Sequence, residues 1–290
     1  CDLGLWADEQ MDAWRWIVAD TKAAGATMAV QLNHAGRKAS TGCFSIGFEH
    51  ESVPEEQGGW KTVGPSANAF GSLTKPRALT VDEIHAIVDQ FRDAAWRAYD
   101  IGFDAVEIHA AHGYLLSQFL DPLINEREDE YGGSFKNRIR MLVEVVDAVR
   151  SVVPDTMPVL VRVSATDWAA GGWDLDQTVD LAKVLKEHGV DLVDVSTGGM
   201  IPGVAIPVKP GYQVPFSEQV RSRAGIPTTA VGLITKPKQA KKILKSGAAD
   251  AIEIGRAALR DPNWPLRAAH KLGIPTEDAP YQPQYVRGAY

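Results

Sequence analysis

The chain has 290 residues, of which 45% are hydrophobic and 23% charged, and its formal net charge at pH 7 is −7. This acidic balance argues against nucleic acid as a partner, and no apolar run reaches the roughly 20 residues that span a bilayer, so we expect neither a nucleic-acid nor a membrane partner. Two cysteines, Cys1 and Cys43, are too few for a disulfide framework. We therefore expect a protein of the reducing cytoplasm.

Predicted helices and strands alternate along the chain. Amphipathic stretches predict helices over 8–24, 80–102, 134–153, 176–188, 215–224 and 235–247. Short apolar runs predict buried strands over 26–32, 103–109, 157–163, 190–196, 226–232 and 249–255. Thr80 to Glu83 reads as a capping box, and Ser134 and Thr235 are expected to be N-caps.

This alternation predicts a parallel sheet covered by helices, the α/β class. No G-x-G-x-x-G motif marks an open doubly wound sheet, and polar residues follow the strands, which is typical of a (β/α)8 TIM barrel. Only six strands are found, and 33–79 reads as an excursion because it is rich in Gly, Ser and Pro. We expect a single domain over 1–290 that supplies six of eight βα units. The first two strands are expected to be missing, and 280–290 to form a tail.

Glycines follow the last two predicted strands. Gly232 opens GLIT (232–235), and Gly255 and Arg256 lie in IGRAAL (254–259). In barrels the corresponding loops commonly bind phosphate, through backbone N–H groups at a helix start. The alternative is that these glycines only make tight turns.

Arg162 ends the strand VLVRV and is expected to point into the barrel mouth. A buried arginine needs an anionic or carbonyl partner. The partner is either a ligand or a structural carboxylate, and Glu107 and Asp194 at neighbouring strand ends are candidates for the second case.

His109, His112 and Tyr114 follow the apolar run that ends at residue 108. A zinc site usually has H-x-x-x-H spacing and a third ligand, and this H-x-x-H has neither, so we expect no metal. Two imidazole donors at the barrel mouth could hold an oxyanion, and Tyr114 could deliver a proton. Simple packing of the two histidines is the remaining alternative.

The chain resembles the Old Yellow Enzyme family of FMN-dependent ene-reductases, in its bacterial xenobiotic-reductase-like or thermophilic-like branch. The resemblance rests most specifically on HAAHGYLLSQFLDPLINEREDEYGGSFKNR (109–138). Further matching segments are VQLNHAGRKAS (30–40), GWKTVGPSANAFG (59–71), VRVSATD (161–167), IGRAALRDP (254–262) and QYVRGAY (284–290).

The resemblance implies roles for residues that would hold FMN. Gln31 would hydrogen-bond the flavin pyrimidine, and Arg162 would lie near N1 and O2 of the flavin. The backbone at Gly232 and Gly255, together with Arg256, would bind the FMN phosphate.

The resemblance also implies a reaction. His109 and His112 would bind the carbonyl oxygen of an α,β-unsaturated substrate, Tyr114 would donate the proton, and NADPH or NADH would be the reductant. Arg287 would reach into the active site of a neighbouring subunit, so we expect a homo-oligomer, a dimer or tetramer.

The chain departs from the branch pattern at its start, where a Pro-Met-Cys segment beneath the flavin is absent; Cys1 does not align with that cysteine. Three alternatives stay open. A dienoyl-CoA-type reductase usually has an iron–sulfur cluster and a further domain, which the cysteine count and length disfavour. The others are a flavin-independent barrel lyase or isomerase with a phosphate site, and an inactive truncated homologue.

Overall fold

The computed structural model describes residues 2–42 and 51–290, so Cys1 and Cys43 lie outside the described residues. All six predicted strands form one parallel sheet, in which each strand pairs with the strand of this sheet that follows it along the chain. They are β1 (Ala29–Leu32), β4 (Ala105–Ala110), β5 (Val159–Ser164), β6 (Leu192–Ser196), β7 (Thr228–Ala230) and β8 (Ala251–Ile252). A strand order without reversal is that of a TIM barrel rather than of a doubly wound sheet. The chain forms six βα units of a (β/α)8 barrel.

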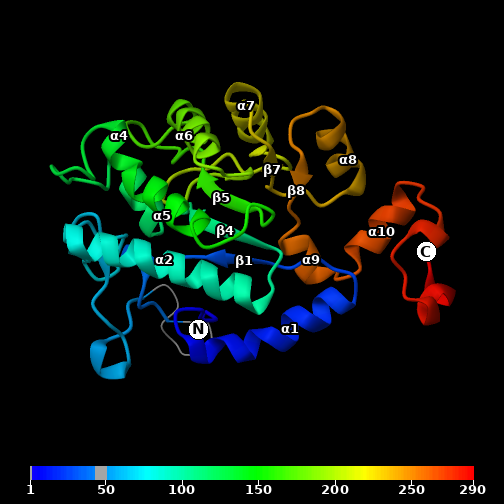
Figure 1. The fold of residues 1–290 in the computed structure, drawn as a ribbon. Coiled ribbons are helices and arrows are strands. Elements are labelled where there is room, and N and C mark those ends of the chain that lie inside the picture. The colour runs from blue at the N-terminus through cyan, green and yellow to red at the C-terminus, as the bar shows by residue number, and fades with distance from the viewer. Residues whose placement is uncertain (1, 43–50) are drawn as a thin grey trace.

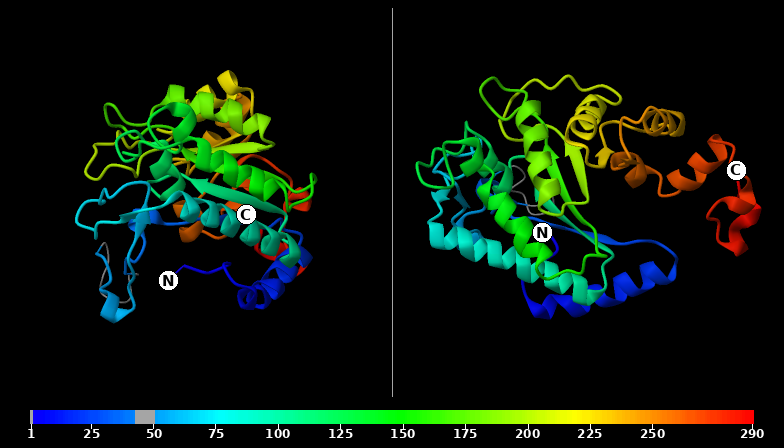
Figure 2. Two further views of the ribbon diagram at one scale, coloured as in Figure 1. Left: turned by 60° about the vertical axis from the view of Figure 1, so that its left-hand side comes forward. Right: turned by 45° about the horizontal axis from the view of Figure 1, so that its top comes forward.

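Helices cover the outer face of this sheet (Figures 1 and 2). Those that follow one another round it are α2 (Val81–Ile101), α5 (Arg140–Arg150), α6 (Leu175–Glu187), α7 (Val214–Ala224) and α8 (Pro237–Lys245). The remaining helices are α1 (Met11–Ala23), α3 (Leu115–Leu120), α4 (Phe135–Arg138), α9 (Arg256–Arg260) and α10 (Trp264–Lys271). No helix among 2–42 and 51–290 is long and apolar enough to cross a membrane.

The predicted capping box begins α2. Thr80 Oγ1 accepts a hydrogen bond from the Glu83 N–H at 3.2 Å, and the Glu83 carboxylate accepts one from the Thr80 N–H at 2.8 Å. Each bond satisfies a donor that the first helical turn leaves without a partner. Gly102 ends the helix in the left-handed conformation, with φ 103°.

Two helix predictions need correction. The helix expected over 134–153 is divided at Ile139 into α4 and α5, although Ser134 does cap α4 as predicted. Thr235 does not cap α8, whose N-cap is Lys236, without a side-chain cap bond. Pro237 occupies the first helical position, where its fixed φ and missing N–H suit a helix start.

The two faces of the sheet differ in chemistry because side chains alternate along each strand. The outward side chains Val106, Val161 and Val193 are fully buried in the hydrophobic core. The inner face instead presents Glu107 and Arg162, both half-buried. The helices therefore form the apolar core with one face of the sheet, and the other face is left for chemistry.

In its described residues, 33–42 and 51–79, the excursion contains two strands that the sequence did not predict. β2 (Val63–Gly64) and β3 (Arg77–Ala78) pair in parallel, outside the main sheet. Each has two residues, too few for an alternating pattern to be recognised.

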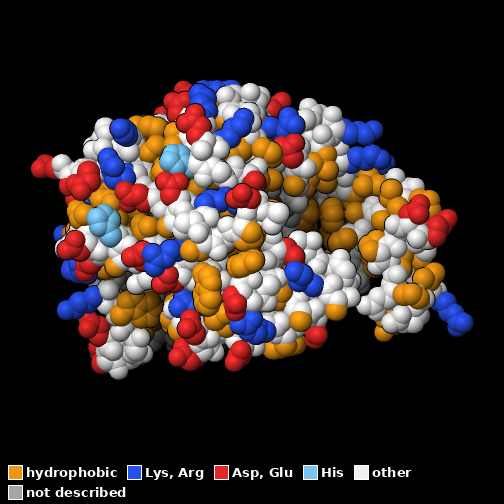
Figure 3. Space-filling model, viewed as in Figure 1, with side chains coloured by type: hydrophobic (Ala, Val, Ile, Leu, Met, Phe, Trp, Pro, Cys, Tyr) orange, Lys and Arg blue, Asp and Glu red, His pale blue; other side chains and the backbone are white. Residues whose placement is uncertain are grey.

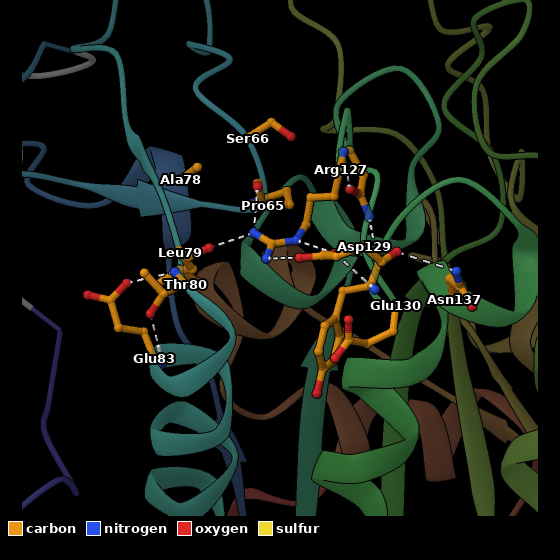
Figure 4. Close-up of polar contacts among 12 residues, drawn as sticks. Pro65, Ser66, Ala78, Leu79, Thr80, Glu83, Arg127, Asp129, Glu130 and Asn137 are labelled. Carbon is orange, nitrogen blue, oxygen red and sulfur yellow. Dashed lines mark hydrogen bonds and ion pairs between the residues drawn. The ribbon is translucent and has the colours of Figure 1, made fainter.

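Arg127 fastens the excursion to the loop between α3 and α4 (Figure 4). Its guanidinium donates to the carbonyl oxygens of Pro65 at 3.1 Å and Leu79 at 2.6 Å. Asp129 forms an ion pair with the same guanidinium at 2.5 Å. One arginine therefore joins both ends of the β2–β3 segment to the loop that follows α3.

The C-terminal part extends away from the sheet, beyond α10 (Figures 1 and 2). Lys and Arg side chains gather over α8 in Figure 3, where Lys238, Lys241 and Lys245 are exposed. The lysine-rich face of α8 is therefore solvated.

Candidate active site

His109 is the last residue but one of β4, at the carboxyl end of the sheet, and its backbone pairs in register with Arg162 of β5. Arg162 in turn pairs with Asp194 of β6. Partners in register on parallel strands point to the same face. The histidine and the arginine predicted to act therefore lie side by side on the inner face.

The two histidines form a directed chain of hydrogen bonds. His109 Nδ1 accepts from the Ala111 N–H at 3.3 Å, so the proton of this neutral ring is on Nε2. His109 Nε2 lies 3.2 Å from His112 Nδ1, and His112 Nε2 lies 2.7 Å from Ser196 Oγ. The Nε2–H tautomer of both rings satisfies all three contacts, with Ser196 as the last acceptor.

Both imidazoles are neutral at physiological pH. Burial, together with the Arg162 charge, lowers the pKa of His109 to about 4. Burial, then the neighbouring His109 and Arg162, lowers the pKa of His112 to about 3. Each ring therefore offers one N–H donor and no charge of its own.

The backbone at His112 adopts the left-handed conformation, with φ 57°. A residue other than glycine needs surrounding contacts to hold this conformation. The His112 N–H donates to Ser164 Oγ at 2.9 Å, and Lys38 Nζ donates to the His112 carbonyl at 2.8 Å and to the Gly199 carbonyl at 2.5 Å. At Gly113, an added Cβ would meet the Gly199 carbonyl oxygen at 2.4 Å, so only glycine fits there.

Tyr114 is the N-cap residue of α3 and is half-buried. Its ring lies edge-on to the His109 ring, with 5.0 Å between the centroids. Lys38 Nζ lies 5.6 Å from the Tyr114 ring centroid. The structure thus brings all three predicted catalytic residues together.

A charged cluster lies on the inner face below the histidines. Arg162 forms ion pairs with Asp194 at 2.8 Å and Glu253 at 3.3 Å. Gln31 Nε2 donates to Glu107 Oε1 at 3.1 Å. The structural ion pair that the sequence offered for Arg162 is present with Asp194, and Glu253 was not predicted.

Burial and the Asp194 charge raise the pKa of Glu107 to about 7 and that of Glu253 to about 8. These two carboxyls and Asp194 are also close enough together, among the residues described, to be ligands for one metal ion. The Arg162 guanidinium forms ion pairs with two of these three carboxyl groups, those of Asp194 and Glu253.

The predicted phosphate residues lie at the ends of neighbouring strands, since β7 pairs with β8. Gly232 has φ 116°. Gly255 is the N-cap residue of α9, and no heavy atom lies within 4 Å of the position that its Cβ would occupy. Arg256 is exposed beside it. Space is thus open at the start of α9, beside an exposed guanidinium.

Arg287 is not brought to this site. It is exposed in the C-terminal 3-10 helix Pro283–Gly288 and lines a hollow of the tail with Tyr281 and Tyr290.

Sequence reasoning missed Lys38 and Glu253, and it placed Ser196 at a strand end without giving it a role. Lys38 lies within VQLNHAGRKAS, which was recognised as a matching segment, but nothing in its spacing shows that it would reach the His112 carbonyl. Ser196 and Glu253 become partners of His112 and Arg162 only when strands distant in sequence pair.

Comparison with known proteins gives the family. The model of the NADH:flavin oxidoreductase / NADH oxidase family matches residues 1–274. The chain belongs to this family. The resemblance to the Old Yellow Enzyme family is therefore confirmed, and the protein is a flavin oxidoreductase with FMN as cofactor and NADH or NADPH as reductant.

Curated relatives are similar over most of their length. An NADPH dehydrogenase of Geobacillus thermodenitrificans is 46% identical over 288 residues, which cover 99% of this chain and 78% of the relative. An NADPH dehydrogenase of Listeria monocytogenes is 47% identical over 282 residues, 97% of this chain and 77% of the relative.

Solved structures share the fold. Morphinone reductase in complex with tetrahydroNAD gives a TM-score of 0.74 at 31% identity, covering 94% of this chain and 73% of that one. An Old Yellow Enzyme homologue from Zymomonas mobilis gives 0.75 at 30% identity, covering 92% and 74%. A 2-naphthoyl-CoA reductase gives a TM-score of 0.82 at 26% identity. The match covers 95% of this chain and 42% of that protein.

Proposed function

We propose that this flavin oxidoreductase reduces the activated C=C bond of α,β-unsaturated carbonyl compounds, with NADPH as the electron source. The observation that carries the proposal is the pair of neutral histidine donors beside Tyr114 at the carboxyl end of β4. The names of the curated relatives, NADPH dehydrogenases, favour NADPH over NADH. The cytoplasm stays our predicted location.

The described residues fit an FMN bound along the inner face. Gln31 is exposed there and offers amide donors, and the Arg162 guanidinium offers positive charge. Gly232, Gly255 and Arg256 would hold the phosphate, because space is open at the start of α9. When bound, FMN supplies the hydride that reduces the alkene.

His109 and His112 would bind the substrate carbonyl oxygen and stabilise the negative charge that develops on it. Their N–H groups now point to His112 and Ser196, so substrate binding must replace one or both of these contacts. Tyr114, beside the His109 ring, would donate the proton to the carbon next to the carbonyl.

We further propose that the tail over 280–290 docks on a second copy of the chain, where Arg287 enters the neighbouring active site. Exposed aromatic side chains at Tyr285 and Tyr290 support a docking role for this segment.

The reaction is tested by purifying the chain, measuring its bound FMN and adding a small cyclic enone with NADPH under anaerobic conditions. We expect NADPH oxidation to require the enone and to yield the saturated ketone in equal amount. NADPH oxidation by the FMN-loaded chain in air, without turnover of any enone, nitroalkene or maleimide tested, would contradict the proposal.

A further inference from the structure

A second charged cluster, outside the residues used by the reaction, is almost completely buried. It consists of Arg37, Asp121 and Asp167, which are respectively 2%, 0% and 2% exposed to solvent. Arg37 follows β1, Asp121 ends α3, and Asp167 lies in the loop after β5. Three segments distant in sequence thus bring their charges to one dry place.

The two carboxyl groups each have one oxygen with a backbone donor. Asp121 Oδ1 accepts from the Leu123 N–H at 2.6 Å, and Asp167 Oδ2 accepts from the Trp173 N–H at 2.7 Å. The other oxygens, Asp121 Oδ2 and Asp167 Oδ1, are buried and receive no bond from an amide, guanidinium or hydroxyl of the described residues. Asp121 acts on Asp167 through a side-chain hydrogen bond as well as through its charge. One proton shared between the two carboxyls would supply the donor that their unpartnered oxygens lack.

The cations that face this pair are Arg37 and Arg138, the latter bonded through Nε to the Leu120 carbonyl at 2.8 Å. Asp174 also acts on Arg138. Burial and the neighbouring Asp121 outweigh the Arg37 charge and raise the pKa of Asp167 to about 9. The pair therefore holds its proton at neutral pH.

This cluster is connected to the catalytic loop. Arg37 Nη2 donates to the Met200 carbonyl at 2.6 Å in the loop after β6. The next residue, Lys38, holds the His112 carbonyl. Asp121 ends the helix that begins after Tyr114. The loops after β1, β4, β5 and β6 are therefore joined through the cluster.

We propose that Asp167, through a proton shared with Asp121, is a positioning residue that keeps the loops of His112 and Tyr114 in their active arrangement. The inference rests on the proposed function of these two residues. Loss of the shared proton would leave two facing carboxylates in a dry site, and their repulsion would separate the loop after β5 from the end of α3.

Asp167→Asn tests this directly, because its amide can donate the same hydrogen bond to Asp121 and cannot lose a proton. We expect wild-type affinity for a phenolic ligand to fall relative to that of D167N by up to about fourfold as pH rises from 7 to 9.5, because about three quarters of Asp167 has lost its proton half a unit above a pKa of about 9. The ionisation of the ligand cancels in this ratio. Asp167→Ala, which lacks the donor, should bind weakly at every pH. A ratio of wild-type affinity to D167N affinity that does not change with pH would overturn the positioning role.

Thermal unfolding of the same proteins is the second readout. A carboxyl with a raised folded pKa stabilises the fold fully below its unfolded pKa, near 4, and loses this contribution as pH rises through about 9. The unfolding midpoint of wild type should therefore fall by about 5 °C relative to D167N over this range. If the unfolding midpoints of wild type and D167N change with pH in the same way, no proton is shared. If His109→Ala leaves phenol affinity unchanged, the proposed function fails and the positioning role fails with it, whatever the midpoints show.

Discussion

His112 illustrates how much the active site depends on single residues. Its left-handed backbone is unfavourable for a residue other than glycine, its pKa lies far below the usual value for histidine, and both depend on neighbours. Ser164 and Lys38 hold the backbone, while His109 and Ser196 hold the ring. The backbone of the site is therefore set before a substrate arrives, while the two N–H groups must exchange their present acceptors for the substrate oxygen.

Tyr114→Phe tests the proton donor at this scale. We expect reoxidation of the reduced flavin by an enone to slow by about 100-fold, because a positioned general acid contributes about this much. Flavin reduction by NADPH should stay within about twofold of wild type, since that step needs no proton from Tyr114. Rapid-mixing absorbance measurements follow both steps separately. Tyr99→Phe, on the exposed side of α2, is the matched control; equal enone rates for the two variants would exclude Tyr114.

At the scale of helices and strands, local sequence signals were sufficient where the structure depends on neighbours in the chain. The six strands and the Thr80 capping box are of this kind. The break at Ile139 and the pairing of β2 with β3 depend on packing between distant segments. Thr235 was wrongly predicted to be an N-cap, because α8 begins two residues later, at Pro237.

Thr80→Ala tests the start of α2. Without the hydroxyl, the Glu83 N–H loses its acceptor, and the free energy of unfolding should fall by about 1 kcal/mol in denaturant titrations. Thr80→Ser keeps the hydroxyl and should lose much less. A loss of the same size in both variants would mean that the threonine methyl group, rather than the cap, stabilises the helix.

At the scale of the whole molecule, the sheet separates an apolar outer face from a charged inner one. The sequence predicted the barrel class, the strand order and the residues at the strand ends. It did not predict the Arg162–Glu253 ion pair, because these residues are 91 positions apart and meet only when the sheet curves. The same holds for the pairing of Asp121 with Asp167.

The raised carboxyl pKa values give stability a pH dependence. Because the pKa of Glu253 is raised to about 8 in the fold, its contribution is fully present below the unfolded value near 4.5 and is lost as pH rises through about 8. Glu253→Gln cannot ionise, so its unfolding midpoint should rise relative to wild type between pH 5 and 9. Glu218→Gln, at an exposed position of α7, is the control, and its unfolding midpoint should follow that of wild type. A midpoint difference that does not change with pH would contradict the raised pKa.

The central claim is that His109 and His112 together bind an oxyanion over the flavin. It is tested most directly by titrating a phenol into FMN-loaded wild type, His109→Ala/His112→Ala and the surface control His188→Ala, while recording the long-wavelength charge-transfer band. We expect the double variant to bind at least about 100-fold more weakly, since each lost hydrogen bond to a charged oxygen costs about 1.5–3 kcal/mol, and the control to match wild type. An unchanged band and affinity in the double variant would contradict the claim.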